Sequence, residues 1–282
     1  MEFGFLFWLF LGGIIIAVLQ DVKRQEVDNW LNLFLLIAGF VFVFYGAVLS
    51  GDYDIIFLAG FLLVVMFLIM NLFYYGRIFA GGDAKLLFAM TAFFIGVTFW
   101  ESMINIGVFV LALLISGSVY GLGYSGILYF RNRGSVNKEI ALQVAGGRWQ
   151  VAGGVSLFLM LLGFVDLLFL LIGFLLILFF GLYVFAKGLE NVSMIREVSG
   201  SELREGDWLV NDIVVYRPQA SGRRPQVVIR ADWDGLSLED IELLKGRKKV
   251  LIKHGLPFVP AFLIAFLGYA FLKDWFIGLL IN

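Results

Sequence analysis

The stretch FGFLFWLFLGGIIIAVLQ, residues 3–20, carries no charged side chain and is followed immediately by Asp21. A helix needs roughly 20 apolar residues to span a membrane, because each residue adds about 1.5 Å across a hydrocarbon core about 30 Å thick. We therefore predict that residues 3–20 form a membrane-spanning helix. Asp21 then lies at the end of that helix.

Apolar runs of similar length recur along the chain and set its fold class. The further runs that we expect to span the membrane are 31–49, 55–75, 86–100, 104–130 and 257–281. The run 151–186 is interrupted only by Asp166 and would make a helix of about 54 Å. We expect it to divide near residues 163–166, the alternative being one long helix. The prediction is an all-α polytopic membrane protein with about eight transmembrane helices, six or seven being possible.

The composition agrees with this class and excludes several kinds of site. Of the 282 residues, 61% are hydrophobic and 15% are charged, against about 45–50% and about 25% in ordinary globular domains. The absence of cysteine excludes disulfides, thiolate zinc sites and a cysteine nucleophile. A single histidine leaves little material for an imidazole metal site, and a net charge of −1 argues against a nucleic-acid partner.

The segment 187–254 has the composition of a water-soluble insert. It holds 12 of the 21 Lys and Arg residues and 11 of the 22 Asp and Glu residues. Alternating and β-branched residues predict strands over 208–216, 226–231 and 249–253, with a turn at 232–235. Ser237-Leu-Glu-Asp240 resembles a capping box that starts a helix. We therefore predict a small α+β domain at 187–254, between a transmembrane part at 1–186 and a last span at 255–282.

Basic residues predict the orientation of the chain. Lys23 and Arg24 follow the first span, Arg77 and Lys85 lie between the third and fourth, and further basic residues follow the fifth. Lys and Arg concentrate in cytoplasmic loops. We expect these loops and the insert to face the cytoplasm, in a multi-pass protein of the cell membrane with the lipid bilayer as its surroundings.

Two acids at span ends are the candidates for chemistry. Asp21 closes the first span and Asp83 opens the fourth, so both are expected at the cytoplasmic face. Asp83 could serve only as a helix N-cap after Gly81 and Gly82. Asp21 is harder to explain by stability, because an anion at a helix C-terminus opposes the helix dipole. If the two spans pack together, the carboxylates can meet.

These residues carry a resemblance to a known family. Ala80-Gly81-Gly82-Asp83, followed by Lys85, resembles the GxGD motif of membrane aspartyl proteases, with Ala in place of the first Gly. Asp21 followed by basic residues and then Val27-Asp28-Asn29 resembles the partner motif. Their order and spacing are similar to those of archaeal type IV prepilin peptidases, including the preflagellin (prearchaellin) peptidases. In many archaeal members an Arg stands four positions after the first Asp, where this chain has Gln25.

The resemblance implies an aspartic endopeptidase of the membrane. Asp21 and Asp83 would be the catalytic pair, sharing one proton and a bound water, without a metal or any other cofactor. The implied partners are prepilin- or prearchaellin-like proteins of a type IV pilus or archaellum, whose class III signal peptides carry a short basic segment before an apolar helix. The residues expected to support catalysis or bind substrate are Gly81, Gly82, Lys85, Lys23 and Arg24. The sequence leaves the oligomeric state open.

We further expect Asp83 to be the ionised partner, because a helix N-terminus favours an anion. Glu26 and Asp28 could receive the basic segment of a substrate, or could be solvated loop residues. Two other function classes remain possible: a proton-coupled transporter that uses membrane acids as a relay, and a non-enzymatic assembly protein for pili or archaella in which the insert is a docking module.

Overall fold

The computed structural model describes residues 4–216, 226–232 and 235–281, and the chain in it is mostly helical. It divides into two compact units, Met1–Gly123 with Leu256–Asn282, and Tyr124–Gly255. Within the described residues, five helices are long and apolar enough to cross a membrane, and two shorter apolar helices accompany them, Trp149–Leu162 and Val259–Lys273. The prediction of a polytopic helical membrane protein is confirmed.

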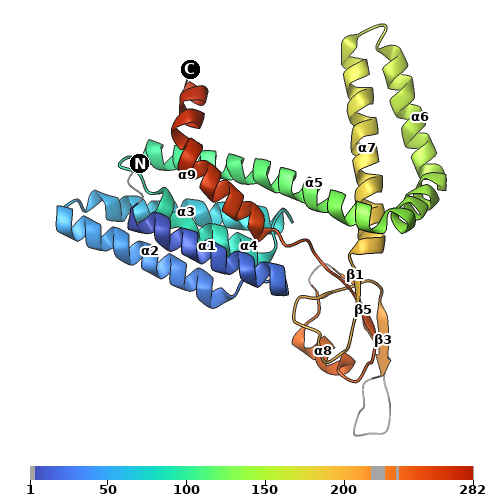
Figure 1. Ribbon diagram of the computed structural model, residues 1–282, viewed down its shortest axis with the longest axis horizontal. Coiled ribbons are helices and arrows are strands. Elements are labelled where there is room, and N and C mark those ends of the chain that lie inside the picture. Colours follow the sequence, from blue (N-terminus) through green and yellow to red (C-terminus); the bar gives the residue numbers. More distant parts are fainter. Residues whose placement is uncertain (1–3, 217–225, 233–234, 282) are drawn as a thin grey trace. The chain divides into compact units, whose positions relative to one another are not determined.

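The first unit is a helical bundle (Figure 1). Its elements are α1 (Phe5–Arg24), α2 (Asn29–Ser50), α3 (Asp54–Tyr75), α4 (Gly81–Ala89), the 3-10 helix η1 (Met90–Phe94), the beginning of α5 (Phe99–Ala145) and α9 (Val259–Ile281). α1 packs against α2 and α9, and α4 packs against α2 and α3. Phe10, Ile14, Leu62 and Phe262 are fully buried in its core.

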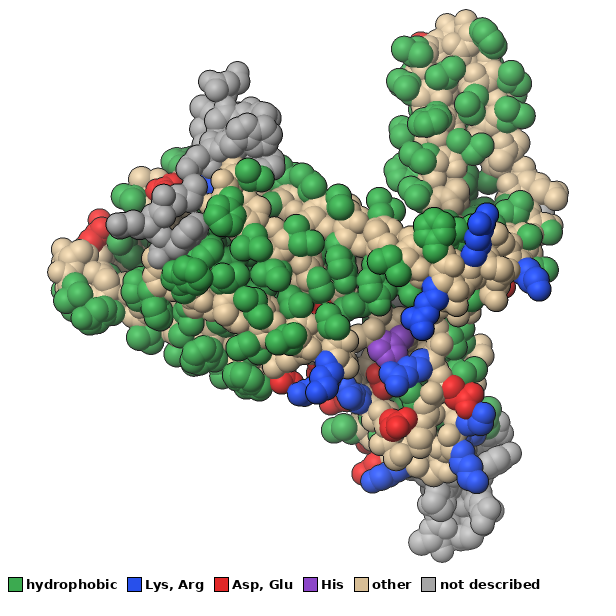
Figure 2. All heavy atoms as spheres, viewed as in Figure 1, with side chains coloured by type: hydrophobic (Ala, Val, Ile, Leu, Met, Phe, Trp, Pro, Cys, Tyr) green, Lys and Arg blue, Asp and Glu red, His purple; other side chains and the backbone are tan. Residues whose placement is uncertain are grey.

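The outward face of this bundle is apolar, as lipid contact requires. Trp8, Leu19, Phe57 and Leu68 are all more than half exposed, and Figure 2 shows hydrophobic side chains over most of this face. In water such a surface would be unfavourable, whereas lipid tails are as apolar as the side chains. The bundle therefore fits the bilayer both by helix length and by surface.

The fourth predicted span, 86–100, differs from the structure. The helix begins earlier, at Gly81, and changes to the 3-10 helix η1 after nine residues, and η1 ends at Phe94. At about 1.5–2 Å per residue, this segment is shorter than a bilayer core. Gly96 and Thr98 belong to the irregular stretch that follows. The loop expected after residue 130 is also helical, because α5 continues to Ala145 through a kink at Asn132.

The second unit contains the hairpin of α6 (Gly147–Leu162) and α7 (Leu167–Ser193), which lie side by side in Figure 1. The predicted division of 151–186 near 163–166 is confirmed. Asp166 is the N-cap of α7, and its Oδ1 accepts a hydrogen bond from the Leu168 backbone N at 2.9 Å. Gly173 lets the helices approach closely, since a Cβ there would lie 2.8 Å from the Met160 N and the Ser156 O.

The insert of the second unit is α+β, as predicted. Its elements are β1 (Ile195–Val198), β2 (Trp208–Leu209), β3 (Ile213–Tyr216), β4 (Gln226–Ile229), α8 (Leu238–Leu244) and β5 (Val250–Lys253). An antiparallel sheet has the order β1-β5-β2, β3 and β4 pair separately, and a small core includes Leu203, Leu236 and Leu244. The capping box of Ser237 and Asp240 starts α8.

The single strand expected over 208–216 is two strands, β2 and β3, because Asn211 and Asp212 favour a turn. The Asp212 Oδ1 accepts a hydrogen bond from the Ala231 N at 2.7 Å, which fixes that turn. Of the turn predicted at 232–235, residues 233–234 lie outside the described residues.

The close approach at Gly173 generates a test of the hairpin. We expect Gly173→Ala to lower the free energy of unfolding in detergent by about 1–3 kcal/mol, because the added methyl meets backbone atoms that cannot rotate away. Gly181→Ala on the same helix is the matched control, since a Cβ there meets nothing within 4 Å. Equal stability of the two variants would contradict this packing.

Candidate active site

Asp21 is buried on the last turn of α1, with 4% of its surface exposed. Its Oδ2 accepts a hydrogen bond from the Val259 backbone N at 2.8 Å, and the carboxylate also accepts one from the Phe258 backbone N–H. Val259 is the first residue of α9. The carboxylate therefore closes the N-terminus of α9, whose unpaired N–H groups and dipole favour an anion.

Asp83 is buried in the first turn of α4, with 7% of its surface exposed. It is the third residue of this helix and not its N-cap, because the helix already begins at Gly81. Its carboxylate accepts a hydrogen bond from the backbone N–H of Ala80, the N-cap residue. A carboxylate at this position satisfies a free donor of the helix start, as in half of a capping box.

Asp21 and Asp83 interact electrostatically although 62 positions separate them in sequence, and both side chains are withdrawn from solvent. Charges in such a place interact more strongly than charges in water. The structure therefore contains two buried carboxylates that interact, and their role as a catalytic pair stays a prediction.

The loop after α1 lies directly against the glycines before Asp83. Gln25 adopts a left-handed conformation with φ of 57°, and its N–H bonds to the Asp21 carbonyl at 2.7 Å, which ends α1. Val27 then turns inward and is 2% exposed. A Cβ on Gly82 would lie 3.2 Å from the Val27 N, so only glycine fits there without displacing the loop.

The first turn of α2 contacts the residues on either side of Asp83. The Lys85 Nζ donates a hydrogen bond to the Asn29 Oδ1 at 2.8 Å. The Asn32 Nδ2 donates to the carbonyl of Gly82 at 3.4 Å. Asn32 was not predicted from the sequence. The available signal was a polar residue one position inside an otherwise apolar span.

Asp28 organises the first loop. It exchanges two hydrogen bonds with Gln20, each of 3.0 Å, accepts one from the Trp30 Nε1 at 3.1 Å, and pairs with Arg24 at 3.6 Å. These contacts give Asp28 and Arg24 a role in the loop itself. Lys23 and Glu26 are exposed, so they could meet a ligand from outside.

The hydrogen bonds bear on which acid carries the charge. Asp21 accepts two backbone N–H bonds, whereas Asp83 accepts one. Hydrogen bonds donated to a carboxylate favour its ionised form. They favour Asp21 as the anion, the opposite of the assignment expected from the sequence, which did not account for the N-terminus of α9 meeting Asp21.

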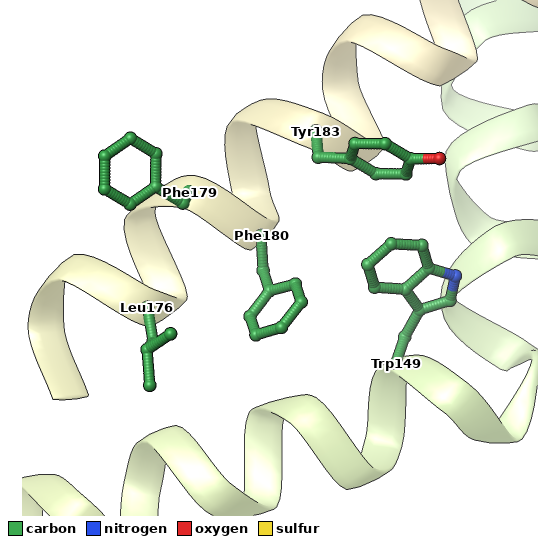
Figure 3. Close-up of a pocket in the computed structure, with 5 residues that line it drawn as sticks. All are labelled: Trp149, Leu176, Phe179, Phe180 and Tyr183. Atoms are coloured by element: carbon green, nitrogen blue, oxygen red, sulfur yellow. The ribbon is translucent and has the colours of Figure 1, made fainter. Parts of the chain in front are cut away.

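Other possible sites in the described part of the chain are different in kind. No group of three or more His, Cys, Asp or Glu among the described residues is arranged to hold a metal ion. An open apolar hollow of about 470 Å³ lies in the second unit, lined by Trp149 of α6 and by Leu176, Phe179, Phe180 and Tyr183 of α7 (Figure 3). It contains none of the candidate catalytic residues.

Comparison with known proteins points to the same region as the two acids. Residues 8–126 match the type IV leader peptidase family. Over 154 residues the chain is 27% identical to a preflagellin peptidase of Methanococcus maripaludis (strain C6), and this match covers 49% of the chain and 66% of the relative, just under two thirds of its length. No solved structure matches the chain. Both Asp21 and Asp83 lie inside the matched segment, so the similarity to the type IV leader peptidase family covers the part of the chain that carries the two acids.

Proposed function

We propose that the protein is a membrane aspartic endopeptidase that cleaves the class III signal peptides of prepilin- or prearchaellin-like proteins. The observation that carries the proposal is the buried pair of Asp21 and Asp83, whose charges interact across the packed helices of the first unit. The family of residues 8–126 and the preflagellin peptidase relative support the same activity and substrate class.

The chemistry needs only groups that the site contains and a water molecule. Ionised Asp21 takes a proton from the water molecule, and the oxygen of that water attacks the scissile carbonyl carbon. Protonated Asp83 donates its proton to the carbonyl oxygen. The tetrahedral intermediate then collapses, its C–N bond breaks, and the leaving amine takes up a proton from the pair. Two carboxylates that are coupled in this way titrate as one unit.

Neighbouring residues support this step in different ways. Gly82 keeps the backbone of the Asp83 segment close to Val27, and Gly81 precedes it with little around it. Lys85 is exposed and bonds to Asn29, so it holds the segment from the water side. Exposed Lys23 and Glu26 are the groups of this loop that a polar substrate segment could meet, whereas Arg24 and Asp28 stabilise the loop.

We also propose that the site and the insert face the cytoplasm. The support is the distribution of basic residues: Lys23, Arg24, Arg77 and Lys85 follow one set of span ends, while Asp52 and Asp54 lie in a loop without basic residues. A signal peptide with a basic segment before an apolar helix would then be cut at the cytoplasmic face of the membrane.

The first test removes each acid in turn. We expect Asp21→Asn and Asp83→Asn each to reduce cleavage of a prepilin-like substrate by about 10³-fold or more, because neither amide can replace its carboxylate in proton transfer. The measurement is the cleavage rate in proteoliposomes, with membrane insertion and thermal stability as controls. Undiminished cleavage by either variant would refute the pair as the catalytic groups, whereas no cleavage by the wild-type chain would make the transporter or the assembly protein the better hypothesis.

The second test uses the two glycines as a matched pair. Gly82→Ala should lower the cleavage rate by about tenfold or more, because its methyl pushes against the Val27 backbone and displaces the Asp83 segment. Gly81→Ala should be tolerated, since its nearest neighbour is a Tyr74 ring carbon at 3.5 Å. If the two variants cleave equally well, close approach at Gly82 is not required.

The third test addresses orientation and uses the absence of cysteine in the chain. Single cysteines are introduced at two exposed positions, Glu205→Cys in the insert and Asp52→Cys in the acidic loop. A membrane-impermeant maleimide applied to intact cells should label Asp52→Cys and leave Glu205→Cys unlabelled until the cells are opened. The reverse pattern would place the insert outside and contradict the proposed cytoplasmic site.

A further inference from the structure

The segment that carries Asp83 is held at both ends by asparagine amides. At its beginning the Asn32 Nδ2 donates to the carbonyl of Gly82 at 3.4 Å. At its end the Asn105 Nδ2 donates to the carbonyl of Phe94, the last residue of η1, at 3.2 Å. Asn32 belongs to α2 and Asn105 to α5, so the α4–η1 segment is tied to two different helices of the bundle.

The two polar contacts from α2 are made with residues before and after Asp83 in the sequence. Asn29 and Asn32 are three residues apart and therefore share one face of that helix. Asn32 bonds to Gly82, the residue before Asp83, and Asn29 bonds to Lys85, two residues after it. A helix face with two contacts on opposite sides of one residue fixes both the position and the rotation of that residue.

Stability alone is a poor explanation of Asn32. The residue is 6% exposed, and among the described residues its Oδ1 has no hydrogen-bond partner. A buried polar atom without a partner is unfavourable, and an apolar side chain of similar size would avoid it. The amide orientation is also determined, because only the NH2 group can face the Gly82 carbonyl. The contribution of the Asn32 amide is therefore its contact with the segment that carries Asp83.

We propose that Asn32, assisted by Asn29, is a positioning residue that sets the place of the Asp83 carboxylate relative to Asp21. This inference rests on the proposed peptidase function. Asn32 acts through the backbone of Gly82 and takes no part in proton transfer. Its effect should therefore appear in the chemical step and in the pH dependence of that step, since the titration of two coupled carboxylates depends on their separation.

The test compares two buried asparagines of the same bundle. Asn32→Ala should lower kcat by about tenfold or more with KM changed by less than about twofold, and should shift the pH profile of kcat. Asn105→Ala is the matched control: this residue is 4% exposed, donates one bond to a carbonyl and has an unpartnered Oδ1, but it holds the segment end away from Asp83. It should lower thermal stability while kcat and the pH profile stay close to wild type.

Further variants test the positioning role even if Asn32→Ala does not fold. Asn32→Asp keeps the shape of the side chain but has no N–H to donate, so it should show the same loss of kcat. Asn29→Ala, at an exposed position, should show a smaller fall in the same direction, and it decides the matter if neither Asn32 variant folds. Wild-type kcat and pH profile in the folded variants, or the same loss in Asn105→Ala, would overturn the positioning role.

The readouts separate this inference from the proposed function. The probe is a prepilin-like protein with a basic leader before an apolar helix, reconstituted with the full chain in liposomes. If Asp21→Asn and Asp83→Asn abolish cleavage while Asn32→Ala is normal, only the positioning role fails. If the two Asp variants still cleave, the assignment of the catalytic pair fails, and if the wild-type chain does not cleave, the peptidase proposal itself fails.

Discussion

The site depends on the hydrogen bond between the Asp21 carboxylate and the Val259 backbone N, which joins residues 238 positions apart in sequence. It connects the end of α1 to the beginning of α9, so the first and last helices of the chain meet at one carboxylate. In a bilayer, unpaired N–H groups at a helix end are costly. Asp21 satisfies two of them, and these bonds offset part of the cost of burying its carboxylate. A single interaction therefore contributes both to the closure of the bundle and to the environment of one candidate catalytic group.

Asp83, the second acid, is held in place by a different set of contacts. Asp83 belongs to a short segment, α4 and η1, that is held by amide contacts from neighbouring helices. A buried segment of this kind is rigid only if its polar groups are satisfied. Gly82 adds close contact with the Val27 backbone, which keeps the loop after α1 and the segment together. The two carboxylates are thus set by separate supports that meet at one site.

Much of this arrangement could be predicted from the sequence, and the exceptions have physical reasons. Hydrophobic run length predicted the long spans and the division at Asp166, and scarcity of charge singled out Asp21 and Asp83. The early start of α4 and its change to a 3-10 helix depend on packing against α2 and α3. The length of a hydrophobic run contains no information about such packing. Asn32 and the contact between Asp21 and α9 were missed because each joins elements far apart in sequence.

If Asp21 and Asp83 act as one coupled pair, infrared difference spectroscopy of their carboxyl groups should show it. The purified chain in lipid is titrated as wild type, as Asp21→Asn and as Asp83→Asn. We expect two coupled steps in the wild type and a displaced midpoint for the acid that remains in each variant. An Asp83 midpoint that is the same with and without Asp21 would contradict it.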